Sequence, residues 1–165
     1  GTAGRGKSTR SGTQPFVGDA THAPSVLPHL PYAYAVLDEL TVWTGAGLEP
    51  SRADAGVRRE SGGPRELYLT AVWEPEHPDL NGDLWPEGMT VSWSHLTGWA
   101  ADDGTDVRAL DGLDPVAPPE LVADAVLHLA VFGLHTAWVP PIGGRWARAG
   151  SFDGAMNAWR EATGS

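Results

Sequence analysis

The chain has 165 residues, of which 41% are hydrophobic and 19% charged, a composition typical of a globular protein and not of a disordered one. Its 11 basic and 21 acidic residues give a net charge of −10, which disfavours binding to nucleic-acid backbones and lipid headgroups. Cysteine is absent, so disulfides and thiolate metal sites are excluded. No apolar run has the length of a membrane span or a signal peptide, and we expect a cytoplasmic protein without a membrane anchor.

Residues 1–25 are interpreted as a flexible basic arm, because they are rich in Gly, Ser and Thr and lack apolar periodicity. Arg5, Lys7 and Arg10 give residues 1–15 a charge of +3 and leave −13 for the rest of the chain. We therefore expect these three residues to contact an anionic surface weakly. Nucleic acid is disfavoured as a partner, except for weak binding through this arm.

Residues 1–8 also match the phosphate-binding loop pattern G-x-x-x-x-G-K-[ST]. A working loop lies between a buried strand and a helix, whose N-terminal amides surround the phosphate. The sequence shows no strand before the match, and Gly12 and Pro15 stand where the helix should run. We interpret the match as a result of Gly-rich composition and expect no nucleotide cofactor.

The first predicted helix covers residues 30–45. Pro31 suits its first turn, and Gly45 suits its C-terminal end. The apolar residues at helical spacing are Ala33, Val36, Leu37, Leu40 and Trp43. We expect this face of the helix to pack on the core.

Short strands follow this helix. Residues 57–60 and 65–73 flank a Ser-Gly-Gly-Pro turn and predict a hairpin, and residues 89–95 and 99–103 predict another. Both faces of 65–73 are mostly apolar, which favours a central strand covered on both sides. The segment 74–88 predicts a long acidic loop between the hairpins.

Two more helices are predicted. Pro118 and Pro119 suit the first turn of a helix that Gly133 ends. Its expected buried stripe consists of Leu121, Val122, Ala125, Val126, Leu129 and Phe132. A short helix capped by Ser151 is expected near the C-terminus, with Phe152, Met156 and Trp159 on one face.

These elements predict an α+β fold, in which a small antiparallel sheet of three or four strands is packed by two helices. We expect this core domain to cover residues 26–135. The basic arm precedes it, and a Trp-rich, loop-rich extension over residues 136–165 follows it and ends in the short helix.

Sequence patterns for catalysis or metal binding are incomplete. Asp79, Asn81 and Asp83 are spaced like calcium ligands, but the glycine and the glutamate that an EF-hand loop needs further on are missing. No histidines pair at helical spacing as in zinc proteases, and the serines beside His95 lack a nucleophile elbow. We therefore expect no catalytic residue, no metal site and no cofactor, although a site assembled across loops stays open.

Eight tryptophans are the main anomaly of composition. Exposed tryptophans mark binding surfaces, although a loop-rich fold also uses them to pack loops on its core. We predict an acidic, aromatic binding surface on the 74–87 loop and the following hairpin. Its expected members are Glu74, Glu76, His77, Asp79, Asp83, Trp85, Trp93, His95 and Trp99.

The order of parts resembles a family of small, uncharacterised actinobacterial proteins of unknown function. The resemblance lies in residues 31–40, 66–73, 90–102 and 115–129: a Tyr-containing helix, strands with Trp, a polar turn before Gly-Trp, and a Pro-started helix. In the turn, where that family tends to have acids, this chain has Ser-His-Leu-Thr. The resemblance implies an α+β fold and no activity.

The charge and the tryptophans favour a non-enzymatic protein-binding module, such as an adaptor, a regulator or an immunity-type inhibitor. Its partner would be a basic protein, because opposite charges favour association. Two alternatives stay open. One is a structural component of a larger assembly, whose arm and tail wrap its neighbours. The other is an enzyme or small-ligand-binding domain whose site is assembled across loops.

Overall fold

The structure is a computed structural model that describes residues 27–42, 48–59, 63–139 and 144–163. Its elements are, in chain order, α1 (Leu30–Val42), β1 (Arg52–Arg59), β2 (Arg65–Trp73), β3 (Met89–Ser94), β4 (Gly98–Asp102), β5 (Val107–Ala109), α2 (Pro119–Phe132) and α3 (Ala149–Thr163). The strands form one antiparallel sheet in the order β1-β2-β3-β4-β5, so each strand pairs with its neighbour in sequence.

The predicted α+β class is confirmed, whereas the strand count of three or four is too low by at least one. The sheet has five strands. The additional strand, β5, has only three residues and two of them are exposed, so it carries no alternating pattern that the sequence would reveal. Strand β1 begins at Arg52, earlier than the predicted hairpin, because its first residues pair with the end of β2.

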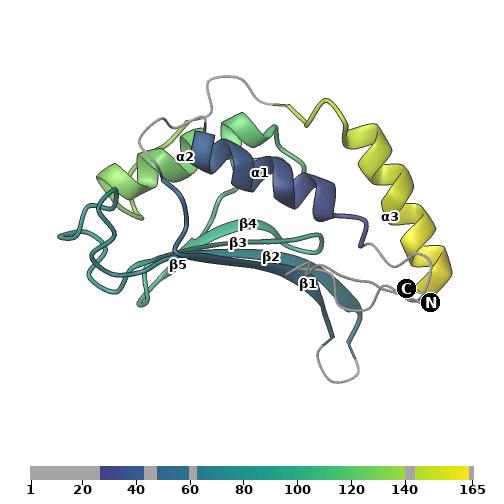
Figure 1. Ribbon diagram of the computed structural model, residues 1–165, viewed down its shortest axis with the longest axis horizontal. Coiled ribbons are helices and arrows are strands. Elements are labelled where there is room, and N and C mark those ends of the chain that lie inside the picture. The colour runs from purple at the N-terminus through teal and green to yellow at the C-terminus, as the bar shows by residue number, and fades with distance from the viewer. Residues whose placement is uncertain (1–26, 43–47, 60–62, 140–143, 164–165) are drawn as a thin grey trace, which may run out of the picture.

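The molecule has two layers. Helices α1 and α2 lie side by side over one face of the sheet, and α3 runs down one end of the molecule beside the start of α1 (Figure 1). Leu69 and Trp93 pair across β2 and β3 and point toward the helices, as do Ala71 and Val91. The core therefore lies between the sheet and the helix pair.

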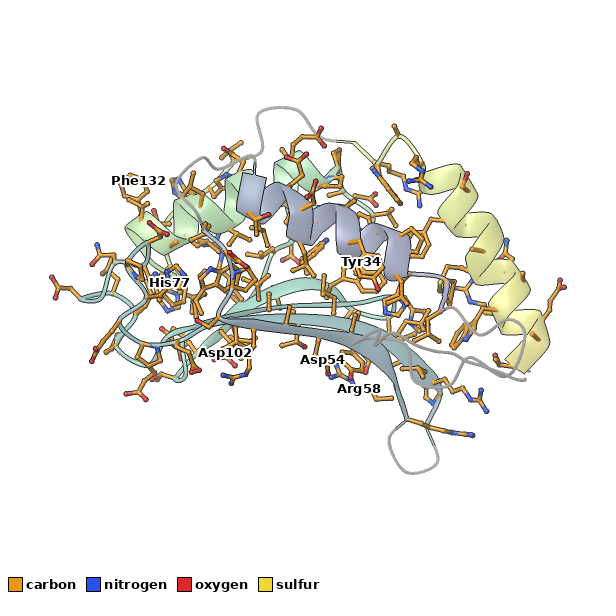
Figure 2. All side chains as sticks on the ribbon, in the orientation of Figure 1. Tyr34, Asp54, Arg58, His77, Asp102 and Phe132 are labelled. Carbon is orange, nitrogen blue, oxygen red and sulfur yellow. The ribbon has the colours of Figure 1, made fainter. Side chains whose placement is uncertain are left out.

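The opposite face of the sheet is not covered by the described residues, so the prediction that both faces of β2 are covered is wrong. Tyr68, Thr70 and Val72 are partly exposed on this face. Asp54 and Arg58 of β1 project from the same side (Figure 2). The Tyr68 hydroxyl donates a hydrogen bond of 2.8 Å to Asp54, and the Arg58 guanidinium lies 4.7 Å from the centre of the Tyr68 ring. Polar cross-strand contacts thus stabilise a face that the apolar pattern alone assigned to a core.

Helix α2 begins and ends where the sequence predicts. Pro119 occupies its first position, and Gly133, whose φ of 103° suits glycine, donates its amide to the carbonyl of Leu129. The predicted stripe is buried except for Phe132, which is 59% exposed and points away from the sheet (Figure 2). Phe132 is the last residue of the helix and contacts the His128 ring, with 4.8 Å between ring centres.

Helix α3 joins the same hydrophobic core as α1, α2 and the sheet. Phe152, Met156 and Trp159 are buried on one face, as the sequence predicts. The helix starts at Ala149, so Ser151 lies inside its first turn and does not cap it. No helix among the described residues is long and apolar enough to span a membrane.

Candidate functional site

The three tryptophans of the predicted binding surface are buried, so the expectation that they are exposed is wrong. Trp85, Trp93 and Trp99 are 0%, 2% and 3% exposed. The indole N–H of Trp85 donates to the carbonyl of Leu129 at 2.9 Å, and that of Trp93 donates to the carbonyl of Pro115 at 2.6 Å. Buried backbone acceptors thus satisfy the indoles of Trp85 and Trp93, whereas the buried Nε1 atom of Trp99 has no hydrogen-bond partner among the described residues. All three side chains belong to the core and do not face a partner.

The polar residues of the 74–87 loop are used mainly to hold the loop. Glu74 pairs with Arg52 at 2.5 Å, and the Nε2 atom of His77 bonds the carbonyl of Glu49 at 2.9 Å. The other ring nitrogen of His77 accepts the amide of Asp79 at 3.1 Å. Glu76 and Asp83 are exposed, and a partner-binding role for this loop stays a prediction.

His95 does not form the hydrogen bond that a Ser–His catalytic pair needs. Its Nδ1 atom accepts the backbone amide of Leu67 at 3.0 Å. The hydroxyl of Ser94, which is 3% exposed, donates to Glu66 instead. Burial, as the largest cause, lowers the pKa of His95, which favours a neutral ring. Arg5, Lys7 and Arg10 lie outside the described residues, so their expected contacts are not described.

A cavity of the described residues lies elsewhere, between α1, the start of α2 and the segment before α3. Its volume is about 620 Å³. Its lining residues are Ala35, Asp38, Glu39, Pro118, Pro119, Glu120, Leu121, Arg145, Trp146 and Ala147. We call it the acidic cavity, because three carboxylates, those of Asp38, Glu39 and Glu120, line it.

Each wall of the acidic cavity follows from local structure. Asp38 and Glu39 lie on α1 next to the apolar stripe, so they stand at the edge of the helix pair. Glu120 lies in the first turn of α2, where an acid is favoured by the helix dipole. Trp146 is fixed by its amide, which donates to the carbonyl of Val116 at 2.7 Å.

Two carboxylates of the acidic cavity, those of Asp38 and Glu120, are exposed to solvent, and Glu39 is partly buried. The Glu39 Oε2 atom is closed to solvent and has no hydrogen-bond partner among the described residues. Burial, followed by repulsion from Glu120 and Asp38, raises the pKa of Glu39. Arg145 is the one basic side chain that lines the described cavity, and Asp153 binds it through two hydrogen bonds of 3.1 Å each. The Asp114 carboxylate also lies near this guanidinium, with 3.5 Å between its Oδ1 atom and the Nε atom of Arg145.

Comparison of the chain with protein-family models, with curated proteins and with solved structures finds no match. The resemblance to small actinobacterial proteins stays an expectation.

One group of side chains in the described part of the chain could hold a metal ion. Single ligand atoms of Asp103, Asp106 and His135 lie within 4.8 Å of one another, at the turn between β4 and β5. Asp106 and His135 already pair at 3.1 Å, and their side chains are 56% and 69% exposed. The Asp103 carboxylate accepts the amides of Thr105 and Asp106 and so shapes the turn. We assign no ion to this group, because exposed turn carboxylates form such contacts without one.

The residues of the acidic cavity were not singled out by the sequence. Asp38 and Glu39, Glu120, and Trp146 lie in three segments that are far apart in the chain, so no short motif contains them. The available signals were weak: an acidic pair at the edge of an apolar stripe, an acid after two prolines, and a tryptophan in a Pro/Gly-rich segment. The packing of α1 on α2 and the hydrogen bond between the Trp146 amide and the Val116 carbonyl bring these residues together.

Proposed function

We propose that this protein is a non-enzymatic binding module that takes a basic segment of a partner protein into the acidic cavity. The observation that carries this proposal is the Glu39 Oε2 atom, which is buried without a hydrogen-bond partner among the described residues, beside Glu120 and Asp38. A guanidinium or ammonium group would supply the missing hydrogen bond and offset the repulsion among the carboxylates.

The size and the wall of the cavity support an organic cation. A volume of about 620 Å³ suits a side chain or a short peptide segment and far exceeds the space that a metal ion needs. Trp146 offers an aromatic wall, and indoles attract cations. The guanidinium of Arg148 already lies 5.2 Å from the centre of the Trp146 ring.

Binding is better supported than catalysis. The described residues that line the acidic cavity include no Ser, Thr, Tyr, Cys, His or Lys, so it lacks the usual nucleophiles of covalent catalysis. Its polar side chains are three carboxylates, one indole and the paired Arg145. This set favours recognition of positive charge.

The proposal is tested by titrating the full chain with an arginine–glycine peptide at low salt and measuring the Kd by calorimetry. We expect the double substitution Glu39→Gln and Glu120→Gln to weaken binding about tenfold, because two of three charges are lost. The matched control is Glu76→Gln with Asp83→Asn, which removes two charges from the 74–87 loop. We expect less than about a twofold change there.

Two results would contradict the proposal. If the loop variant weakened binding more than the Glu39/Glu120 variant, the peptide would bind at the 74–87 loop, as the sequence first indicated. Equal weakening by both variants would show that the peptide senses only the net charge of −10 and has no site. Capture of a partner from host lysate by the intact chain, but not by the Glu39/Glu120 variant, would then identify the natural ligand.

A further inference from the structure

We infer that this protein pairs with a second copy of itself through the free edge of β1, in an antiparallel register centred on Gly56. The pairing joins the sheets of the two copies into one continuous sheet. It does not depend on the proposed function, since the acidic cavity is lined by residues of the helices and of the segment before α3 and not by the sheet edge. The exposed edge, the geometry of strand pairing and the charges of β1 support this inference.

Strand β1 is the longer of the two edge strands of the sheet. It covers Arg52–Arg59 and, among the described strands, pairs with β2 alone. Five of its eight residues are exposed, and it contains no proline. The other edge strand, β5, has three residues and is too short to hold a partner strand firmly. Strand β1 therefore offers the longer row of backbone N–H and C=O groups to another strand.

The geometry of the backbone limits how two copies of β1 can pair. Along an antiparallel edge strand, the N–H and C=O groups of every second residue point away from the sheet. In two identical strands these are residues of the same parity, so odd-numbered residues must face odd-numbered ones and even-numbered residues even-numbered ones. Two such registers pair seven residues of β1: one is centred on Ala55 and joins residues 52–58, and the other is centred on Gly56 and joins residues 53–59.

The charges of β1 select between these two registers. The register centred on Ala55 places Arg52 opposite Arg58 of the second copy. Like charges directly opposite each other destabilise a strand pair. The register centred on Gly56 instead places Asp54 opposite Arg58 of the second copy, and its twofold symmetry produces this pair twice. Opposite charges at directly opposed positions stabilise a strand pair, so the charges favour the register centred on Gly56.

Asp54 and Arg58 can form these pairs and keep their contacts within the chain. Both are exposed and project from the open face of the sheet (Figure 2). Asp54 accepts the Tyr68 hydroxyl through Oδ2, and its Oδ1 atom can accept a second donor. Arg58 donates to Glu66 through Nε, and both of its Nη groups carry further donors. Each side chain can therefore bond to a second copy without losing the bond that positions it.

Pairing in this register also covers an exposed apolar side chain. Val57 is 43% exposed and pairs with Leu67 on the helix side of the sheet. The register centred on Gly56 places Val57 opposite Ala55 of the second copy, so apolar side chains meet on this side. The paired segment, residues 53–59, is only about 23 Å long, so the interface is small and we expect a weak dimer that forms with rising concentration.

Sedimentation equilibrium of the full chain over a range of protein concentrations tests the inference. We expect the natural chain to dimerise, and Asp54→Arg and Arg58→Asp each to weaken dimerisation at least about tenfold, because each change makes both charge pairs repulsive. An equal mixture of the two variants should recover the dimer, since one copy then carries two positive charges and the other two negative ones at the opposed positions. Asp83→Arg makes the same charge change on the exposed 74–87 loop and should alter dimerisation less than about twofold.

Three results would overturn the inference. A natural chain that stays monomeric up to about 1 mM would show that the edge of β1 does not pair. Tighter dimerisation of Arg58→Asp alone would indicate the register centred on Ala55, because this change removes the repulsion from Arg52. A mixture that does not recover the dimer, although circular dichroism shows both variants folded, would mean that residues 54 and 58 do not face each other.

Discussion

The hydroxyl of Tyr32 donates a hydrogen bond of 2.6 Å to the carbonyl oxygen of Ala117. Ala117 comes directly before Pro118 and Pro119, where α2 begins, so this bond ties α1 to the start of α2. The tie joins the helix that carries Asp38 and Glu39 to the start of the helix that carries Glu120. The geometry of the acidic cavity thus depends on a buried contact outside its lining.

Replacing Tyr32 with Phe should lower the free energy of unfolding by about 1–3 kcal/mol, because the buried carbonyl of Ala117 loses its partner. Urea denaturation followed by tryptophan fluorescence measures the change. Tyr68→Phe is the matched control, since its hydroxyl bonds Asp54 at an exposed position and its loss should cost less than about 0.5 kcal/mol. Equal costs at the two positions would contradict the tie.

Trp85 should behave as a core residue. We expect Trp85→Ala to lower the free energy of unfolding by about 3–5 kcal/mol, because a large buried side chain and its hydrogen bond to Leu129 are both removed. Its neighbour Leu84, 43% exposed, should tolerate the change to Ala within about 1 kcal/mol. A stable Trp85→Ala protein with weakened partner binding would restore the surface role that the sequence suggested.

His29 should make the protein sensitive to acid. It is fully buried, stacks on Trp93, and hydrogen-bonds the carbonyl of Tyr68 through Nε2. Burial lowers its pKa from 6.5 to about 4. Below pH 6.5 the His29 side chain binds a proton in the unfolded chain but stays neutral in the folded chain. The free energy of unfolding therefore falls as the pH drops from about 6.5 to about 4, by about 3 kcal/mol in total.

Unfolding free energies of the natural chain and of His29→Gln, measured at several pH values in this window, check this sign. The variant should lose most of the slope, whatever its absolute stability. His135→Gln, which changes an exposed histidine, should keep the slope. The lowered pKa of His95 adds a smaller contribution in the same direction. Parallel curves for the natural chain and His29→Gln would refute the assignment.

Binding of a cation in the acidic cavity should weaken as the pH falls. The raised pKa of Glu39 means that this carboxylate takes up a proton earlier than an ordinary one, and the neutral form no longer attracts a cation. A bound cation favours the ionised form of Glu39, so binding should release protons at pH values where part of the Glu39 carboxyl is protonated in the free protein. Calorimetry in buffers of different ionisation enthalpy measures that release, and Glu39→Gln should remove it.

Asp153 should support cation binding although it does not line the acidic cavity. Its carboxylate accepts two hydrogen bonds from the Arg145 guanidinium. This negative charge reduces the repulsion between Arg145 and a cation in the cavity. We expect Asp153→Asn to weaken binding of the arginine–glycine peptide about two- to threefold at low salt. Asp83→Asn, which removes the same charge from the 74–87 loop, is the control. An equal loss in the control would mean that net charge alone acts.

The elements with strong local signals could be predicted, and those set by neighbours could not. The prolines and glycine around α2 and the spacing of Phe152, Met156 and Trp159 predict helices correctly, because such signals act within one element. The formation of strand β5 and the exposure of one face of β2 depend on which elements pack beside them. A local sequence pattern does not show those neighbours. The prediction that Trp85 and Trp93 are exposed was wrong for the same reason. Their indoles are buried against the carbonyls of Leu129 and Pro115, which are distant in the sequence.

The sheet connects each strand to the next one along the chain, which has a consequence for the order of folding. Hairpins between adjacent strands close short loops and cost little chain entropy, so residues 52–109 form contacts of low sequence separation. The contact of α1 with α2 encloses that whole segment and closes a much longer loop. Docking of the two helices should therefore be the slow step, and the acidic cavity would be the last part of the molecule to form.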